Sequence, residues 1–184
     1  GLFNRLQVEG FYVEDYQGDT LLYARQVETG ITSFKPLTLG VAKVDGALLR
    51  LAQTPDDEMN IKQVVNRLSR KERERKGGFA LTVDDVYMQD INLVIEQHEH
   101  RHPGYGIDYG DMHIEHMSAL VDDFTLEGSR IGGYIRNFSA VEHCGFMVQN
   151  FTGRFEVDRG VINLSDFEVM AERSDIRLRS LTLR

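Results

Sequence analysis

The sequence predicts a mainly β protein, a curled antiparallel β-meander with one amphipathic helix. Three observations support this fold class. Apolar and polar residues alternate with period 2 through most of the 184 residues, as they do in strands that bury one face. Short turn sequences containing Gly or Asp separate the alternating runs, and gaps of that length join neighbouring strands as hairpins. One stretch only has helical spacing of its apolar residues.

The alternating runs predict strands whose apolar residues share one face. The clearest runs are Phe79, Leu81 and Val83; Ile91, Leu93 and Ile95; Phe151, Gly153, Phe155 and Val157; Ile162 with Leu164; Phe167 with Val169; Ile176 with Leu178; and Leu181 with Leu183. The turns between runs are predicted at Gln17-Gly18-Asp19, Val44-Asp45-Gly46, Asp158-Arg159-Gly160 and Arg173-Ser174-Asp175. Gly132-Gly133 is interpreted as a bulge or a tight bend.

A single helix is predicted over about residues 60–76. Asn60 is a good N-cap, Gln63 completes a capping-box-like pair with it, and Gly77-Gly78 ends the helix. We expect this helix to cover one end or the open side of the sheet. Its apolar stripe consists of Ile61, Val64, Val65 and Leu68.

Composition narrows the classes of partner. The net charge of −8 argues against nucleic acid, which requires clustered Lys and Arg. One basic run, residues 70–76, is interpreted as the solvated tail of the helix, with contact to an anionic membrane surface as the alternative. No apolar run approaches the roughly 20 residues of a membrane-spanning helix. We expect residues 1–184 to be a single elongated β-repeat segment cut from a larger protein.

The histidines are the sharpest polar feature. On a strand, His98, His100 and His102 would share one face, and His113 or His116 could supply a fourth ligand to Zn²⁺ or Cu²⁺. Same-face strand residues lie nearly 7 Å apart, so convergence on one ion requires a strong bend. The favoured interpretation is therefore an exposed strand end that runs into a hairpin loop, with no metal and no other cofactor.

No catalytic residues are predicted. His143 and the single cysteine, Cys144, are adjacent, and neighbours on a regular strand point to opposite faces. The chain contains neither a nucleophile-elbow motif nor a phosphate-binding glycine loop. Its many carboxylates fall on polar strand faces or in turns. The sequence thus favours a surface or a conduit over an enzyme.

Several stretches resemble the AsmA/TamB-like family, in particular the TamB-type translocation and assembly modules of the Bacteroidetes. Residues 13–24, VEDYQGDTLLYA, are similar to a strand opening near the N-terminus of these proteins. Residues 39–51 resemble the strand pair that follows, and residues 60–65 resemble the start of the family helix. Residues 151–155, 160–169 and 174–176 are similar to the family's repeat unit.

The resemblance implies a periplasmic segment of a protein anchored in the inner membrane. It implies a β-groove that carries phospholipid to the outer membrane, or that assists protein assembly there. The partners would be phospholipid or acyl chains, with outer-membrane assembly proteins as further candidates. The residues expected to line this groove are Phe155, Val157, Ile162, Leu164, Phe167, Val169, Ile176 and Leu178.

A physical argument leads in the same direction without the family. A sheet with one apolar face must hide it against a second layer, against itself by curling, or against a ligand. One short helix covers a few strands at most. A closed, filled sandwich would use the same residues, so the sequence leaves groove and sandwich open. Two further alternatives are an adhesin-like interaction module using residues 98–109, and a metal-dependent domain built on the histidines.

Overall fold

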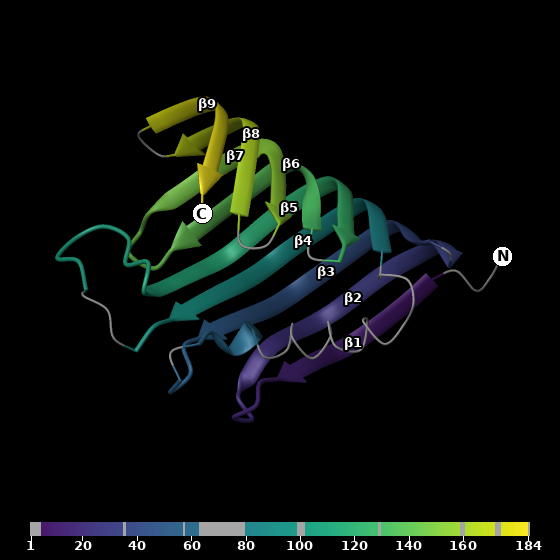
Figure 1. Cartoon of the computed structure of the whole chain (residues 1–184), viewed down its shortest axis with the longest axis horizontal. Coiled ribbons are helices and arrows are strands. Elements are labelled where there is room, and N and C mark those ends of the chain that lie inside the picture. Colours follow the sequence, from purple (N-terminus) through teal and green to yellow (C-terminus); the bar gives the residue numbers. More distant parts are fainter. Residues whose placement is uncertain are drawn as a thin grey trace.

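The computed structural model describes residues 5–34, 36–56, 58–62, 80–98, 102–128, 130–158, 161–171 and 174–183, which form one curled sheet (Figure 1). Within these residues the sheet has nine strands in chain order and is not closed, so β1 and β9 are its two edges. The strands are β1 (Arg5–Glu14), β2 (Thr20–Phe34), β3 (Leu37–Ala52), β4 (Ala80–Glu96), β5 (Asp111–Glu127), β6 (Arg130–Glu142), β7 (Met147–Asp158), β8 (Val161–Ala171) and β9 (Ser174–Leu183).

The predicted fold class is confirmed, with one departure in strand direction. Neighbouring strands are antiparallel throughout the described sheet except for β3 and β4, which run parallel. A parallel pair needs a connection that returns to the starting end of the sheet, and residues 53–79 make that return. The segment that breaks the strand pattern in the sequence is therefore the crossover.

The predicted helix begins where expected, since residues 60–62 are helical. The rest of the predicted helix, residues 63–76 with Gln63 and the basic run, lies outside the described residues. Gly77 and Gly78, predicted to end the helix, also lie outside them. The Asn60 side chain is almost fully buried. Its amide nitrogen donates to Asp15 Oδ2 at 3.1 Å and to the Arg50 carbonyl at 3.2 Å, and its oxygen accepts from the Ala52 N–H at 3.1 Å. Asn60 therefore anchors the crossover to β3 and to the β1–β2 turn.

The turn predictions are right in one place and wrong in another. Residues 15–19 form the β1–β2 turn, in which Asp15 Oδ1 accepts from the Gln17 and Asp19 N–H groups. Val44-Asp45-Gly46 is no turn, because all three residues lie inside β3. Gly46 has a φ of +63°, so the glycine serves a local bend within the strand. Arg159, Gly160 and Arg173, from the other two predicted turns, lie outside the described residues.

Left-handed residues such as Gly46 occur in several strands, each time at the same position relative to the apolar residues. The apolar residues of a strand mostly follow each other in steps of two, and at six strand residues where the backbone turns left-handed the step is three. Asp166, at φ +49°, lies between Leu164 and Phe167 in this way. The left-handed residue directly precedes the apolar residue that resumes the face, and Asp and His tolerate this conformation better than most side chains. The same position is occupied by Gly10, Gly46, Asp90, His116 and Asp123.

The bends allow long strands to curl while one face stays apolar. Register shifts mark the bends of β4, β5 and β8, as expected when one extra residue is inserted into a strand. Gly133 lies opposite one of them, and a Cβ there would lie 3.0 Å from Val121 Cγ1 and 3.1 Å from Phe155 Cε1. The predicted bulge at Gly132-Gly133 is therefore in the partner strand. Figure 1 shows the sheet bending over from β2 towards β6.

Candidate functional site

One face of the sheet is apolar along its whole length, and we call it the apolar face. In an antiparallel pair, residues directly opposite each other point to the same face. Cross-strand partners therefore trace rows across the sheet. One row runs through Val8, Val27, Val44, Met88, Ala119 and Phe138 of β1 to β6. A second runs through Leu37, Leu81, Leu126, Ile131, Val157, Ile162 and Leu183 of β3 to β9.

All eight residues predicted to line a groove lie on this face, on β7, β8 and β9. They form direct cross-strand pairs: Phe155 with Leu164, Val157 with Ile162, Phe167 with Leu178, and Val169 with Ile176. The step of three at Asp166 keeps both halves of β8 in phase. The sequence placed the site in the last three strands, whereas the rows extend the apolar face back to β1.

Burial along the apolar face is uneven. Ala24, Ala47 and Ile91 form a buried cluster at its centre. Phe167 is only 5% exposed, and its ring stacks on Phe151 with centroids 5.9 Å apart. On the outermost strand the same face is open to solvent, with Ile176 48% and Leu178 46% exposed. Among the described residues, the apolar face is therefore more exposed on β9 than at its centre.

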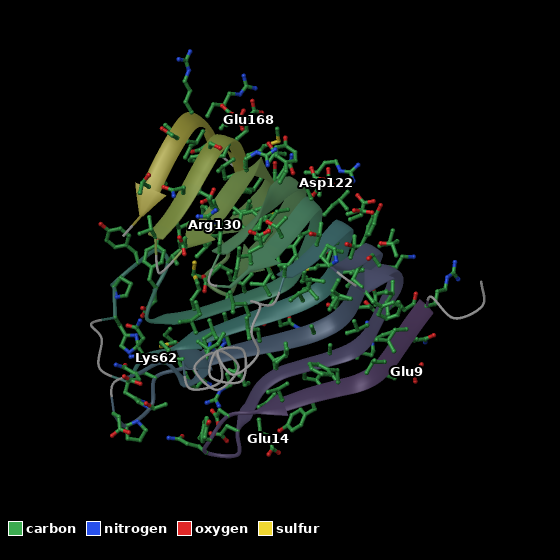
Figure 2. The ribbon with its side chains drawn as sticks, turned by 45° about the vertical axis from the view of Figure 1, so that its right-hand side comes forward. Glu9, Glu14, Lys62, Asp122, Arg130 and Glu168 are labelled. Atoms are coloured by element: carbon green, nitrogen blue, oxygen red, sulfur yellow. The ribbon has the colours of Figure 1, made fainter. Side chains whose placement is uncertain are left out.

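The opposite face is polar and carries ion pairs that cross several strands. Arg136 of β6 reaches Asp122 of β5 at 2.7 Å and Asp85 of β4 at 3.4 Å. Arg25 of β2 reaches Asp45 and Asp90 in the same way. Figure 2 shows side chains of this kind, among them Asp122 and Glu168, pointing away from the inside of the curl. The curl thus separates a charged outer surface from an apolar inner one.

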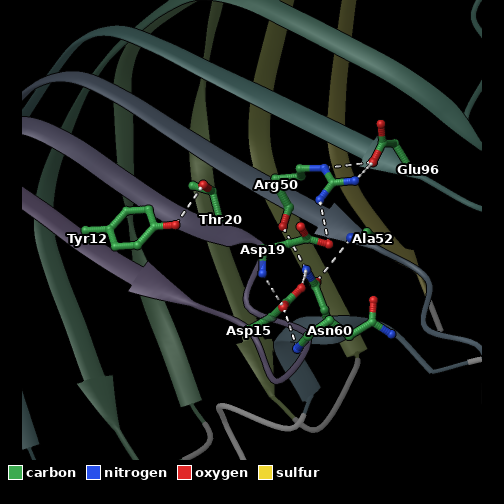
Figure 3. Close-up of polar contacts among 9 residues, drawn as sticks. Tyr12, Asp15, Asp19, Thr20, Arg50, Ala52, Asn60 and Glu96 are labelled. Atoms are coloured by element: carbon green, nitrogen blue, oxygen red, sulfur yellow. Dashed lines mark hydrogen bonds and ion pairs between the residues drawn. The ribbon is translucent and has the colours of Figure 1, made fainter.

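A third ion-pair network lies at the end of the sheet where the crossover starts (Figure 3). The Arg50 guanidinium contacts Glu96 of β4 at 2.6 Å and Asp19 of the β1–β2 turn at 3.7 Å. Asp15 of that turn accepts a hydrogen bond from Asn60. Burial acts to raise the pKa of the Asp15 carboxyl, but the hydrogen bonds from Asn60 and from the backbone of the turn lower this pKa below its usual value. The network therefore fixes the β1–β2 turn, β3, β4 and the start of the helix together.

The four predicted histidines that the structure describes do not converge. His102 Nδ1 contacts Asp108 Oδ2 at 2.7 Å, His113 Nε2 contacts Asp111 Oδ1 at 3.3 Å, and His116 Nδ1 contacts Asp90 Oδ1 at 3.1 Å. His98 is exposed, and His100 lies outside the described residues. Within the described part of the chain, no group of three or more His, Cys, Asp or Glu side chains could hold a metal ion.

Glu142 is a polar residue that the sequence analysis missed. It lies directly opposite Ile114 on the apolar face and is 4% exposed. Burial acts to raise its pKa, but hydrogen bonds from Cys144 and from the His113 N–H, with the nearby His143, outweigh burial and lower the pKa to about 2. A lone Glu at the end of a β run carries no sequence signal that would identify it.

His143 and Cys144 lie in the β6–β7 turn, not on a regular strand as the sequence analysis assumed. Both turn towards Glu142: His143 Nδ1 contacts Glu142 Oε1, and the Cys144 N–H donates to Glu142 Oε2 at 2.7 Å. The carboxylate raises the pKa of the Cys144 thiol, which disfavours the reactive thiolate. This arrangement orders a turn and does not activate a nucleophile.

Two hollows lie over the N-terminal strands, with volumes of about 730 and 910 Å³. The smaller is lined mainly by side chains of the polar face, so its chemistry does not suit an acyl chain. Its lining residues are Gln26, Glu28, Val41, Lys43, Val44, Asp45, Tyr87 and Gln89. The apolar face thus remains the stronger candidate site.

Among the described residues, no helix combines the length and the apolar composition needed to cross a membrane. Comparison with protein-family models and with curated protein sequences finds no match.

Proposed function

We propose that the apolar face holds the acyl chains of lipids, and that the chain is a conduit segment of an AsmA/TamB-like protein. The location follows from the resemblance in residues 13–24 and 151–176: a periplasmic segment tethered to the inner membrane. The proposed activity is phospholipid transport to the outer membrane, or support of protein assembly there. The observation that carries the proposal is the pair of overlapping apolar rows, one across β1 to β6 and one across β3 to β9.

The rows favour a lipid because of how they are arranged. An acyl chain needs apolar contact along its length and no polar recognition, and each buried CH₂ contributes about 0.8 kcal/mol. The rows run perpendicular to the strands, so a chain lying along one row meets apolar side chains from strand after strand. The ion pairs of Arg25 and Arg136 are confined to the opposite face. A filled sandwich needs a second sheet, whereas the nine described strands belong to one.

The proposal is tested by photocrosslinking at two adjacent positions on β8. Val169 belongs to the apolar face, and Met170 lies on the outer face and is 49% exposed. We expect p-benzoylphenylalanine in place of Val169 to crosslink lipid in a membrane-containing preparation, and the same residue in place of Met170 to give little lipid adduct. Mass spectrometry identifies the adduct, and circular dichroism checks that both variants keep the fold. Equal labelling at the two positions, or none at either, would refute the proposal.

A second candidate is a non-catalytic interaction module that uses the β4–β5 loop. The observation in its favour is exposure, since Tyr105 is 93% and Tyr109 74% exposed. Exposed tyrosines are frequent in protein interfaces. The metal-binding alternative has less support, because His102, His113 and His116 each contact a different carboxylate.

A further inference from the structure

The two hollows over the N-terminal strands adjoin each other and form one elongated depression, which we call the outer hollow. The smaller is lined by residues of β2, β3 and β4, and the larger by residues of β1, β2 and β3. Glu28, Val41 and Lys43 line both. The four strands lie side by side in Figure 1, and three strand spacings amount to about 15 Å. The outer hollow is therefore long enough for a ligand of more than one ring.

The strand register places the floor of the outer hollow on the polar face of the sheet. Glu28, Lys43 and Tyr87 are direct cross-strand partners on β2, β3 and β4. Each is the chain neighbour of a residue in the first apolar row, and neighbours on a strand point to opposite faces. The outer hollow and the proposed lipid site therefore use opposite faces of the same strands.

Lys43 differs from the arginines of the polar face. Arg25 and Arg136 are each held by two carboxylates. Lys43 is exposed and lies directly opposite Glu28, yet no carboxylate among the described residues lies within ion-pair distance of it. Glu28 instead accepts a hydrogen bond from the Gln26 amide. The Lys43 ammonium therefore has N–H groups to offer to a ligand in the outer hollow.

Two exposed side chains of β4 lie beside Lys43 in the outer hollow. Tyr87 is the cross-strand partner of Lys43 and is 42% exposed. Gln89 follows two residues later on the same face and also lines the smaller hollow. Within the described part of the chain, neither side chain makes a hydrogen bond. The outer hollow thus presents an aromatic ring, an amide that both donates and accepts, and an ammonium that donates.

This combination suits a hydroxyl-rich ligand without a strong charge. A hydroxyl both donates and accepts, so it can pair with an amide, an ammonium or a carboxylate. The negative face of an aromatic ring attracts the polarised C–H groups of a sugar ring. Lys43 and Glu28 carry opposite charges, so the outer hollow does not select a strongly charged molecule.

The same features make an extended peptide the weaker candidate. Peptides are recognised chiefly by pairing with a sheet edge or by apolar anchors in pockets. β2, β3 and β4 are each hydrogen-bonded on both sides, and the lining around Lys43 is mostly polar. The outer hollow therefore offers a peptide neither mode of binding.

We propose that the outer hollow binds a neutral oligosaccharide, with the Tyr87 ring against one sugar and with Lys43 and Gln89 hydrogen-bonded to hydroxyl groups. The three side chains come from two adjacent strands, so the sheet holds them in a fixed relation before the ligand arrives. This binding function goes beyond lipid transport and uses the opposite face. Its failure would leave the proposed function untouched.

Titration calorimetry with cellotetraose, maltotetraose and chitotetraose tests the proposal. We expect at least one of these to bind, and Tyr87→Ala to weaken that binding by about tenfold or more, whereas Tyr87→Phe, which keeps the ring, retains most of it. The matched control is Tyr12→Ala, because Tyr12 is 47% exposed on the same face and lies outside the outer hollow. It should change the affinity by less than about twofold. Circular dichroism checks that each variant keeps the fold.

Protection from acetylation tests the site without any variant. A bound tetrasaccharide should reduce acetylation of Lys43 in the wild-type chain and leave Lys62 unaffected, since Lys62 is also exposed but pairs with Glu58 at the start of the crossover. Mass spectrometry of peptides reads both lysines in one sample. Equal protection of the two lysines, or protection of neither, would overturn the proposal.

Three results of the calorimetry would also overturn it. The first is the absence of binding by all three tetrasaccharides at millimolar concentration. The second is an equal loss of affinity in Tyr87→Ala and Tyr12→Ala. The third is tighter binding of a hexapeptide of alternating Ser and Gln than of any tetrasaccharide, which would identify the outer hollow as a peptide site.

Discussion

Gly153 of β7 gives the most direct test of how the apolar face is packed. Its φ is +151°, and a Cβ there would lie 2.5 Å from Phe167 Cβ, 2.9 Å from Phe167 Cα and 3.4 Å from the Ser165 carbonyl oxygen. Phe167 is nearly buried, and its backbone belongs to the neighbouring strand, so a side-chain rotation alone cannot relieve the contact. Gly153→Ala should therefore move β7 and β8 apart.

The magnitude follows from two contributions. A non-glycine residue at positive φ costs about 1–2 kcal/mol, and overpacking of a well-packed site adds about 1–3 kcal/mol. Gly145, in the β6–β7 turn, provides a matched control. Its φ is +90°, and a Cβ there meets nothing within 4 Å, so Gly145→Ala has the backbone cost alone. We expect Gly153→Ala to be the less stable of the two variants by about 1–3 kcal/mol.

The assay is urea unfolding of the wild-type chain and both variants, followed by the circular dichroism of the strands. The midpoint and slope give the free energy of unfolding of each protein. If the two alanine variants lose the same stability within about 0.5 kcal/mol, the reasoning about Phe167 is wrong. The reasoning would also be wrong if Gly145→Ala lost more free energy of unfolding than Gly153→Ala.

Two further predictions concern buried polar groups. Because the pKa of Glu142 is about 2 in the folded chain against 4.5 ordinarily, its stabilising effect is present above pH 4.5 and is lost as the pH falls towards 2. Over that window the free energy of unfolding of the wild type should fall by on the order of 1–3 kcal/mol more than that of Glu142→Gln. Unfolding curves measured at a series of acidic pH values test this, and an equal fall in the two proteins would contradict the role of Glu142. Asn60→Ala should cost about 2–4 kcal/mol because it leaves the Ala52 N–H without its acceptor, whereas the exposed Gln7→Ala should change stability by less than about 0.5 kcal/mol. Thermal or urea unfolding measures both, and equal effects would show that the Asn60 hydrogen bonds contribute little.

The faces of the strands could be predicted because alternation is a local property of an extended chain. Leu164 and Ile162 point to one side wherever β8 is placed, and residues of one predicted strand face pair across β7, β8 and β9. A further signal was present in the sequence but unused: an apolar step of three with Asp, His or Gly before the second apolar residue. That signal marks the bends at Asp90 and Asp166.

The errors have a common physical origin. Gly and Asp favour left-handed backbone conformations both in turns and in strand bends, so Val44-Asp45-Gly46 was predicted as a turn although it continues β3. Only the pairing of β3 with β2 and β4 decides between the two. Likewise, the contacts of His143 and Cys144 with Glu142 depend on a turn whose geometry no spacing rule specifies.

By itself, the sequence determined that this protein is built from strands with one apolar face, and where the one non-strand segment begins. These features follow from periodicity, which any extended chain expresses without reference to its neighbours. Only the tertiary structure decided that β3 and β4 run parallel and that the apolar residues of neighbouring strands line up in rows. Those properties depend on register and strand direction between distant residues, and hydrogen bonding across strands sets them jointly.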